Sequence, residues 1–228
     1  MAGRTGGGVG VLFGDCPGAR DDAWLTDAVR TAVLDSDEMW CEVPDPAEVA
    51  GHPRLLEVGL SPDRVLSDRL GAERTKRFEA VARSLGLDPA GLQGLRPWLV
   101  AQLVEQALRA QAGLTAAHAV DRVLLGLARE HGIPVRSEFS IDEVLGRFGQ
   151  MPESGEVQYL DNILERAEGG VASMGQEFTA WASGDLSIGE SIVRQHRAKY
   201  PMVHQAGLTE RNAAWIPRIE TMLDTPGA

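Results

Sequence analysis

The sequence predicts an α/β domain that is predominantly helical, with a small parallel sheet of about three strands covered by about nine helices. One observation is a set of three short apolar runs, each bounded by Gly, Pro or acidic residues, as buried strands are. The other is that apolar residues elsewhere recur at spacings of three and four, the period of an amphipathic helix. The three runs lie at approximately 9–13, 39–43 and 133–139.

The composition is that of one globular domain. The chain has 228 residues, of which 43% are hydrophobic and 24% charged, so we expect a single domain over 1–228 with a flexible glycine-rich start at 1–8. A net charge of −11 would repel a phosphate backbone, so we expect no nucleic-acid partner. No apolar run approaches the roughly 20 residues that cross a bilayer, and "MAGRTGGG" lacks the apolar segment of a signal peptide. We therefore expect a cytoplasmic protein with no membrane partner.

The first two strands are separated by one predicted helix. Within "DDAWLTDAVRTAVLDSD", residues 21–37, apolar side chains fall on one helical face and acids occupy the first turn. Strand, helix and strand in this order imply a right-handed parallel crossover. The stretch from Pro44 to about Asp68 is rich in Pro, Gly and Asp without a regular apolar period, so we expect a long loop of the kind that often lines a site.

Helices account for most of the remaining chain. Gly132 is expected to end the helix that leads into the strand at 133–139, and only helices follow that strand. A sheet this small has an edge that needs either a covering helix or a second copy of the chain, so a homo-oligomer is one of two alternatives. The expected helices span about 72–85, 97–112, 116–131, 141–150, 156–168, 171–183, 186–199 and 208–223.

Glu42 is a carboxylate at the end of a strand that should be covered on both faces. A buried carboxylate is costly unless it is paired or protonated. At the carboxyl end of a parallel strand it would point into the crevice where open α/β sheets bind ligands. The alternative is a frayed strand end at which Glu42 faces solvent before Pro44.

Arg211 and Asn212 interrupt an apolar stripe in the last predicted helix. Asn212 lies at helical spacing from Leu208 and Trp215, and a buried amide needs a partner. Arg211 would carry the positive charge that a buried Glu42 requires. The alternative is that Asn212 caps a local break caused by Pro217.

The turn "GDCPG" at 14–18 follows the first predicted strand and precedes a helix, where nucleophiles and ligands sit in α/β folds. It matches neither a dinucleotide fingerprint nor a P-loop. Cys16 is either a reactive thiol near a helix start, with Asp15 opposing that reactivity, or a plain reduced thiol, as we expect for Cys41. No two of the five histidines have a metal-motif spacing.

The chain resembles the TraB/GumN family, relatives of the Tiki metallopeptidases, from about Val9 to Leu223. The segments that carry the resemblance are "DDAWLTDAVRTAVLDSDEMWCEVPDP", "LRPWL", "AVDRVLLGLAREHGIPV", "AWASGDL" and "LTERNAAWIPRIETML", which occur in the family's order. The resemblance implies a site at the carboxyl edge of the sheet. In active members that site is built from two GxxH motifs, a strand glutamate, a second glutamate in a GLE-like segment and an Arg-Asn pair.

The chain departs from that pattern at three places. The first GxxH aligns with residues 14–17, "GDCP", so proline replaces the imidazole. The GLE-like segment aligns with "SEF", which puts Phe139 at the second carboxylate unless the register slips by one and Glu138 takes its place. The second GxxH would follow the last helix, beyond Ala228. Without both histidines we expect no metal site and no other cofactor.

The residues that still match define the predicted site. Glu42, Arg211, Asn212 and Cys16 are the expected catalytic residues, with Glu42 as a general base and Cys16 as a nucleophile or a lining residue. The expected substrate-binding residues are Asp15, Arg96, Asp121, Arg136 and Glu138.

Three functions follow from this site. The first is metal-independent acid/base chemistry on a small molecule or peptide, a hydrolysis, cyclisation or elimination in a specialised biosynthetic pathway. The second is a pseudoenzyme that binds a ligand or a partner. The third is a metallohydrolase with an unorthodox site made by Asp15, Cys16 and Glu42.

Overall fold

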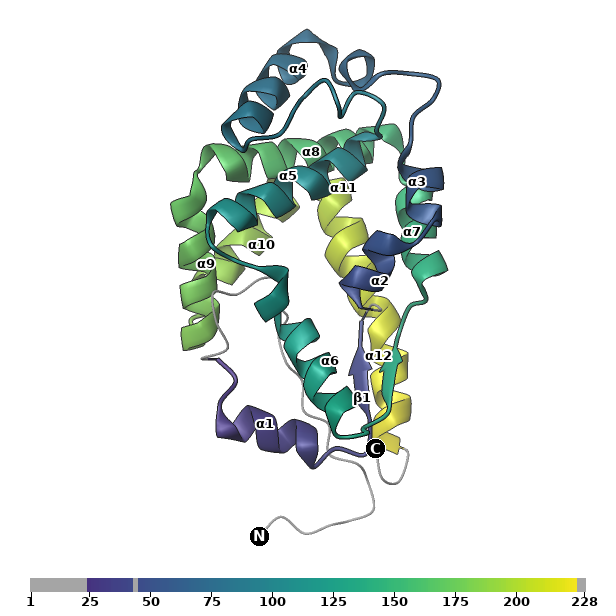
Figure 1. The fold of residues 1–228 in the computed structure, drawn as a ribbon, viewed down its shortest axis with the longest axis vertical. Coiled ribbons are helices and arrows are strands. Elements are labelled where there is room, and N and C mark those ends of the chain that lie inside the picture. The colour runs from purple at the N-terminus through teal and green to yellow at the C-terminus, as the bar shows by residue number, and fades with distance from the viewer. Residues whose placement is uncertain (1–23, 43–44, 225–228) are drawn as a thin grey trace.

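The computed structural model describes residues 24–42 and 45–224 and confirms a predominantly helical α/β fold with a small parallel sheet (Figure 1). Strands β1 (Met39–Cys41) and β2 (Val135–Ser137) pair in parallel, with Met39 opposite Val135 and Cys41 opposite Ser137. The third predicted strand, at 9–13, lies outside the described residues, as do Asp15 and Cys16.

One face of the sheet packs on helices α1 (Asp27–Leu34) and α6 (Val120–Glu130). Side chains alternate across a strand, so Met39 and Val135 share this face while Trp40 and Arg136 point to the other. Gly132 follows α6 with φ of 70°, in the left-handed region that a glycine tolerates, and ends the helix as predicted. The buried members of this cluster are Val33, Val120, Leu124, Leu127 and Ala128.

The prediction of an unbroken loop from Pro44 to about Asp68 was wrong. Two six-residue helices, α2 (Pro46–Gly51) and α3 (Arg54–Gly59), occupy most of the stretch, and α4 (Leu66–Ser84) begins near its end. Helices of this length are too short to display a clear apolar period. Within α4 the backbone breaks at Gly71, where φ is 73°, so the regular helix resumes at the predicted start near residue 72.

The largest core cluster lies between α4, α5 (Pro97–Gln111) and α8 (Glu153–Glu168), which run close together in the upper part of Figure 1. Helices α9 (Val171–Ser183) and α10 (Ser187–Lys199) continue from this layer. None of the described helices combines the length and the apolar character that crossing a membrane requires. The core of this cluster is formed by Leu66, Leu70, Phe78, Val81, Ala82, Val100, Ala101, Val104, Leu160, Ile163 and Leu164.

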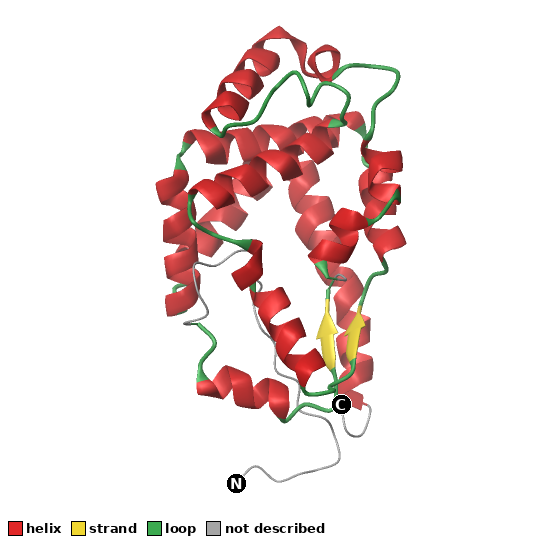
Figure 2. Ribbon diagram, viewed as in Figure 1, coloured by secondary structure: helices red, strands yellow, loops and turns green. Residues whose placement is uncertain are grey.

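The last helical segment runs alongside the strands and is a single helix with an internal irregularity (Figure 2). It begins as α11 (Pro201–His204), passes through a π-helical turn, η2 (Gln205–Thr209), and continues as α12 (Glu210–Asp224). Two other short elements complete the description, the 3-10 turn η1 (Ala116–His118) before α6 and helix α7 (Ile141–Gln150) after β2. Helix α7 and helix α9 have the bounds that the sequence predicted.

Candidate functional site

Glu42 follows directly after β1 and meets Arg211 of α12. The Nε atom of Arg211 lies 2.9 Å from Oε1 of Glu42, and the two side chains are 36% and 29% exposed. Nε is itself buried and has no hydrogen-bond acceptor among the described residues. The contact is therefore an ion pair by distance, without the alignment of a hydrogen bond.

The carboxyl edge of the sheet is held together beyond the last strand residues. The backbone N–H of Glu138 donates to the carbonyl of Cys41 at 2.8 Å, and that of Phe139 donates to the carbonyl of Glu42 at 3.2 Å. Glu42 and Glu138 therefore lie in the tied segments that leave the paired ends of β1 and β2. The Oε2 atom of Glu138 is buried at this edge.

Burial changes the acidity of two carboxyl groups here. Loss of hydration raises the pKa of Glu42, Arg211 and Arg147 oppose the rise, and the neighbouring Asp121 adds to it. Burial also raises the pKa of Asp121, which lies in the first turn of α6. A carboxyl group whose pKa moves upward is better matched to proton transfer near neutral pH than an ordinary surface carboxyl.

Arg147 is a member of this site that the sequence reasoning missed. It lies on α7, and its guanidinium carbon is 3.8 Å from the centroid of the Phe139 ring. Phe139 is buried while Arg147 is exposed. An arginine on the solvent side of a helix looks like an ordinary solvated residue in a sequence, so its stacking on Phe139 and its electrostatic effect on Glu42 are visible only in the structure.

Asn212 points away from the pair that it was predicted to join. Its side chain is exposed, although Arg211 precedes it directly. Neighbouring residues of a helix point about 100° apart, and α12 turns Arg211 rather than Asn212 toward Glu42. The helix continues through Pro217 rather than breaking there, so the alternative role of Asn212 as a cap at such a break is also absent from the described helix.

Arg96 is committed to contacts within the protein. Its guanidinium donates to Glu156 at 2.5 Å and to the carbonyl oxygens of Gly149 at 2.9 Å and Met151 at 3.3 Å. The Glu156 side chain is only 2% exposed. Arg96 thereby joins the start of α5 to the end of α7 and the start of α8. These contacts stabilise the packing of the three helices.

Arg136 points toward the opposite end of β1. Its Nε donates to Glu38 at 2.7 Å, and Glu38 precedes the strand. Trp40 also donates to Glu38, through Nε1 at 2.7 Å. The structure thus brings Glu42, Glu138, Asp121 and Arg211 of the predicted set to one edge, while Arg96, Arg136 and Asn212 lie apart from that group.

The resemblance implies a metal at this edge, and the described residues do not fit one. Between 24–42 and 45–224 no three side chains of His, Cys, Asp or Glu converge as a metal site would require. Glu42 instead pairs with Arg211, a cation that would compete with a metal ion for the same carboxylate. We derive no step through a metal.

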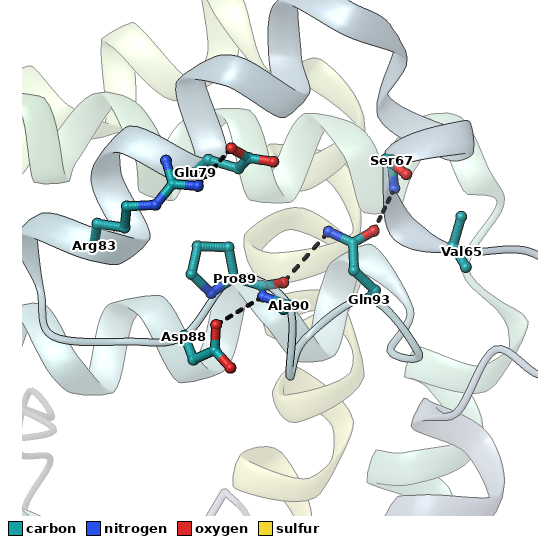
Figure 3. A pocket seen from close by; sticks show the side chains of 8 residues that line it. All are labelled: Val65, Ser67, Glu79, Arg83, Asp88, Pro89, Ala90 and Gln93. Atoms are coloured by element: carbon teal, nitrogen blue, oxygen red, sulfur yellow. Dashed lines mark hydrogen bonds and ion pairs between the residues drawn. The ribbon is translucent and has the colours of Figure 1, made fainter.

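A separate open groove of about 460 Å³ lies between α4 and the segment that follows it (Figure 3). Its polar side chains are directed toward one another. Arg83 pairs with Glu79 at 2.7 Å, Asp88 accepts from the Ala90 N–H at 3.0 Å, and Gln93 accepts from the Ser67 N–H at 3.1 Å. The contact of Gln93 with Ser67 holds the segment against α4, and the other polar groups are satisfied locally, so we interpret the groove as a structural feature.

Comparison with known proteins adds one family and two relatives. The sequence model of the TraB/PrgY/gumN family matches residues 9–228. The chain is 18% identical over 162 residues to proteins named "Uncharacterized protein YbaP" from Escherichia coli (strain K12) and from Shigella flexneri. The alignment covers 69% of this chain and 58% of each relative, so the chain spans little more than half the length of the proteins it matches. No solved structure matches it.

Proposed function

This chain belongs to the TraB/PrgY/gumN family, and from that premise we propose that it is a divergent enzyme in which Glu42 performs acid/base chemistry on a small molecule or peptide. The proposed reactions are hydrolysis, cyclisation or elimination. Each requires a base that removes a proton and an acid that returns one, which a single carboxyl group can do in turn.

The observation that carries the proposal is the environment of Glu42. It follows a parallel strand at the edge where α/β proteins place their chemistry, it is 29% exposed, and a cation lies 2.9 Å away. Burial raises the pKa of its carboxyl group, and Arg211 limits the rise. A carboxyl group whose pKa is raised in this way is a stronger base than an ordinary glutamate.

Each neighbouring residue has a role in this scheme. Arg211 stabilises the carboxylate form of Glu42 before proton transfer and remains close to charge that develops on the substrate. The negative charge of Asp121 adds to the rise in the pKa of Glu42. Glu138 lines the same edge.

Two other functions remain as alternatives. A non-catalytic binding protein is favoured by the ion pair itself, because Glu42 already has a partner in Arg211. A metallohydrolase would need Asp15 and Cys16 as further ligands, and both lie outside the described residues. Metal analysis of the purified protein addresses the second alternative, because a tightly held stoichiometric transition metal would favour it.

The test is a turnover screen with a matched pair of variants. Purified protein is incubated with a panel of p-nitrophenyl esters and N-acetylated dipeptides, and products are followed by absorbance and mass spectrometry. Glu42→Gln keeps the shape and removes the base, so a turnover found in the wild type should fall by about 10²–10⁴-fold. Glu38→Gln is the matched control. Glu38 lies just before the same strand and pairs with Arg136 at 2.7 Å, so this variant should retain turnover.

The outcomes separate the functions. Turnover that survives Glu42→Gln would contradict the proposed chemistry. If the wild type turns over nothing in the panel but a small molecule or protein co-purifies with it in stoichiometric amount, the binding protein becomes the better account.

A further inference from the structure

We infer that the site at Glu42 takes an anionic ligand, a molecule with a carboxylate or phosphate group that the guanidinium groups of Arg147 and Arg211 hold beside the Glu42 carboxyl. This inference deepens the proposed function and rests on it for the chemical step. The binding of the anion, however, is measurable without any turnover.

The first observation is how Arg147 is placed. Its guanidinium lies over Phe139, with the guanidinium carbon 3.8 Å from the ring centroid. The ring is 5% exposed, so its position is fixed by packing and its face can hold the guanidinium by a cation–π contact. Within 24–42 and 45–224, no carboxylate lies at ion-pair distance from Arg147, and its N–H groups have no acceptor there, which leaves them available for a planar anion.

The second observation is the buried Nε of Arg211. It lies 2.9 Å from Glu42, yet it has no hydrogen-bond acceptor in the part of the chain that the structure describes. A buried donor without an acceptor is uncommon and costs stability. An oxygen of a bound anion would supply the missing acceptor.

The third observation links the two arginines. The N–H of Phe139 donates to the carbonyl of Glu42 at 3.2 Å. Phe139, on which Arg147 stacks, is therefore hydrogen-bonded to Glu42, which pairs with Arg211. Both cations accordingly act on the Glu42 carboxyl. The chain as a whole carries a net charge of −11. Two arginines near one strand end are therefore a local positive feature of an acidic protein.

The local charge balance favours an anion. Burial raises the pKa of both carboxyl groups near the arginines, Glu42 and Asp121, and so moves them toward their neutral forms. With a proton on each of these two carboxyls, the two guanidinium groups outweigh the one remaining acid that the structure describes at this edge, Glu138.

The test is a titration of the full chain with two simple anions, inorganic phosphate and N-acetylglycine. Arginine Nε–H signals are followed by nuclear magnetic resonance, and the assignments come from Arg147→Gln and Arg211→Gln. We expect saturable shifts of both signals with at least one of the two anions, and the tighter anion identifies the group that the ligand carries. Arg147→Gln should weaken binding about tenfold or more, because it removes a charge-assisted contact.

The control is Arg197→Gln, which removes the same charge from an exposed position near the end of α10. It should leave the affinity unchanged. Glu42→Gln should bind the anion at least as tightly as the wild type, because it removes a negative charge from the site. The inference is wrong if neither anion causes a saturable shift, or if Arg147→Gln and Arg197→Gln weaken binding equally.

Binding and turnover fail separately in this design. If neither anion binds but Glu42-dependent turnover is found, the anion inference falls and the proposed function stands. If an anion binds through Arg147 and turnover survives Glu42→Gln, the proposed chemistry falls and the anion site stands.

Discussion

Oε1 of Glu42, at the end of β1, lies 2.9 Å from Nε of Arg211 on α12, the last helix of the described chain. The pair forms because Glu42 follows β1 at the carboxyl edge of the sheet and α12 runs alongside the strands (Figure 2). The two residues are therefore joined by the fold as a whole, and their electrostatics can be tested without knowledge of the substrate.

The stability effect of Glu42 should depend on pH. Because its pKa is raised in the folded state, the folded protein holds the proton more tightly than the unfolded chain does. The free energy of unfolding should therefore fall as pH rises from the ordinary glutamate value of 4.5 through the raised pKa. Glu42→Gln lacks this titrating group. The free energy of unfolding of the variant minus that of the wild type, both measured by urea denaturation, should therefore increase as the pH is raised through that window.

Glu105 should show the opposite dependence. Burial alone would raise its pKa, but Arg109 at 2.6 Å and Arg166 at 2.9 Å overcome that effect and lower it. Its stabilising effect is present above the ordinary glutamate pKa and is lost as pH falls through the lowered value. Glu105→Gln should cost about 1.5–3 kcal/mol at neutral pH and progressively less in acid.

The comparison for Glu105 is Glu190→Gln. Glu190 pairs with Arg194 at 3.8 Å, and both side chains are largely exposed. A surface pair of this kind is worth about 0–1 kcal/mol, so urea denaturation should barely distinguish the variant from the wild type. A Glu105→Gln protein that loses no more stability than Glu190→Gln would rule out the buried network as a source of stability.

The ion pair of Arg96 and Glu156 should contribute to the stability of the fold. Glu156→Ala leaves the guanidinium of Arg96 buried without its carboxylate, a change that typically costs about 3–5 kcal/mol. Glu79→Ala, in the exposed pair with Arg83, should cost less than about 1 kcal/mol. Thermal and urea unfolding of both variants measure the difference, and equal losses would refute the structural role of Arg96.

Two glycines should respond to alanine in opposite directions. Gly71 has φ of 73° and ψ of 168°, a conformation that costs other residues roughly 1–3 kcal/mol. Gly126 lies inside α6, and a β-carbon added there would meet no atom within 4 Å, so alanine should stabilise that helix by about 0.5–1 kcal/mol. The free energy of unfolding should therefore fall in Gly71→Ala and rise in Gly126→Ala. A gain in both variants would show that the backbone at Gly71 does not require glycine.

Regular helices were predictable where local signals agree. Helix α7 begins after Ser140, whose side chain accepts from the Glu143 N–H while Glu143 accepts from the Ser140 N–H, and this reciprocal cap is visible in the sequence. Helix α9 ends before Gly184, which adopts the left-handed conformation. Helices α2 and α3 were missed because six residues cannot display an apolar period.

The site was predictable only in part. Glu42 stands out because it is a charge where the strand pattern calls for an apolar residue, and Arg211 because it is the cation next to the apolar stripe that a buried Glu42 would require. Asn212 was placed within the apolar stripe and Arg211 one step around from it, whereas α12 turns Arg211 toward Glu42 and leaves Asn212 exposed. Arg147 has no sequence signal at all, because its importance comes from its contact with Phe139.

The most direct test is the titration of the Glu42 side-chain carboxyl by carbon-13 nuclear magnetic resonance, with its signal assigned by its absence in Glu42→Gln. We predict a titration midpoint above that of an ordinary glutamate, and a further rise of that midpoint in Arg211→Gln, where burial acts without the opposing cation. A midpoint at or below the ordinary glutamate value would contradict the proposed chemistry, because Glu42 would then be a plain surface carboxylate without the acidity that its role requires.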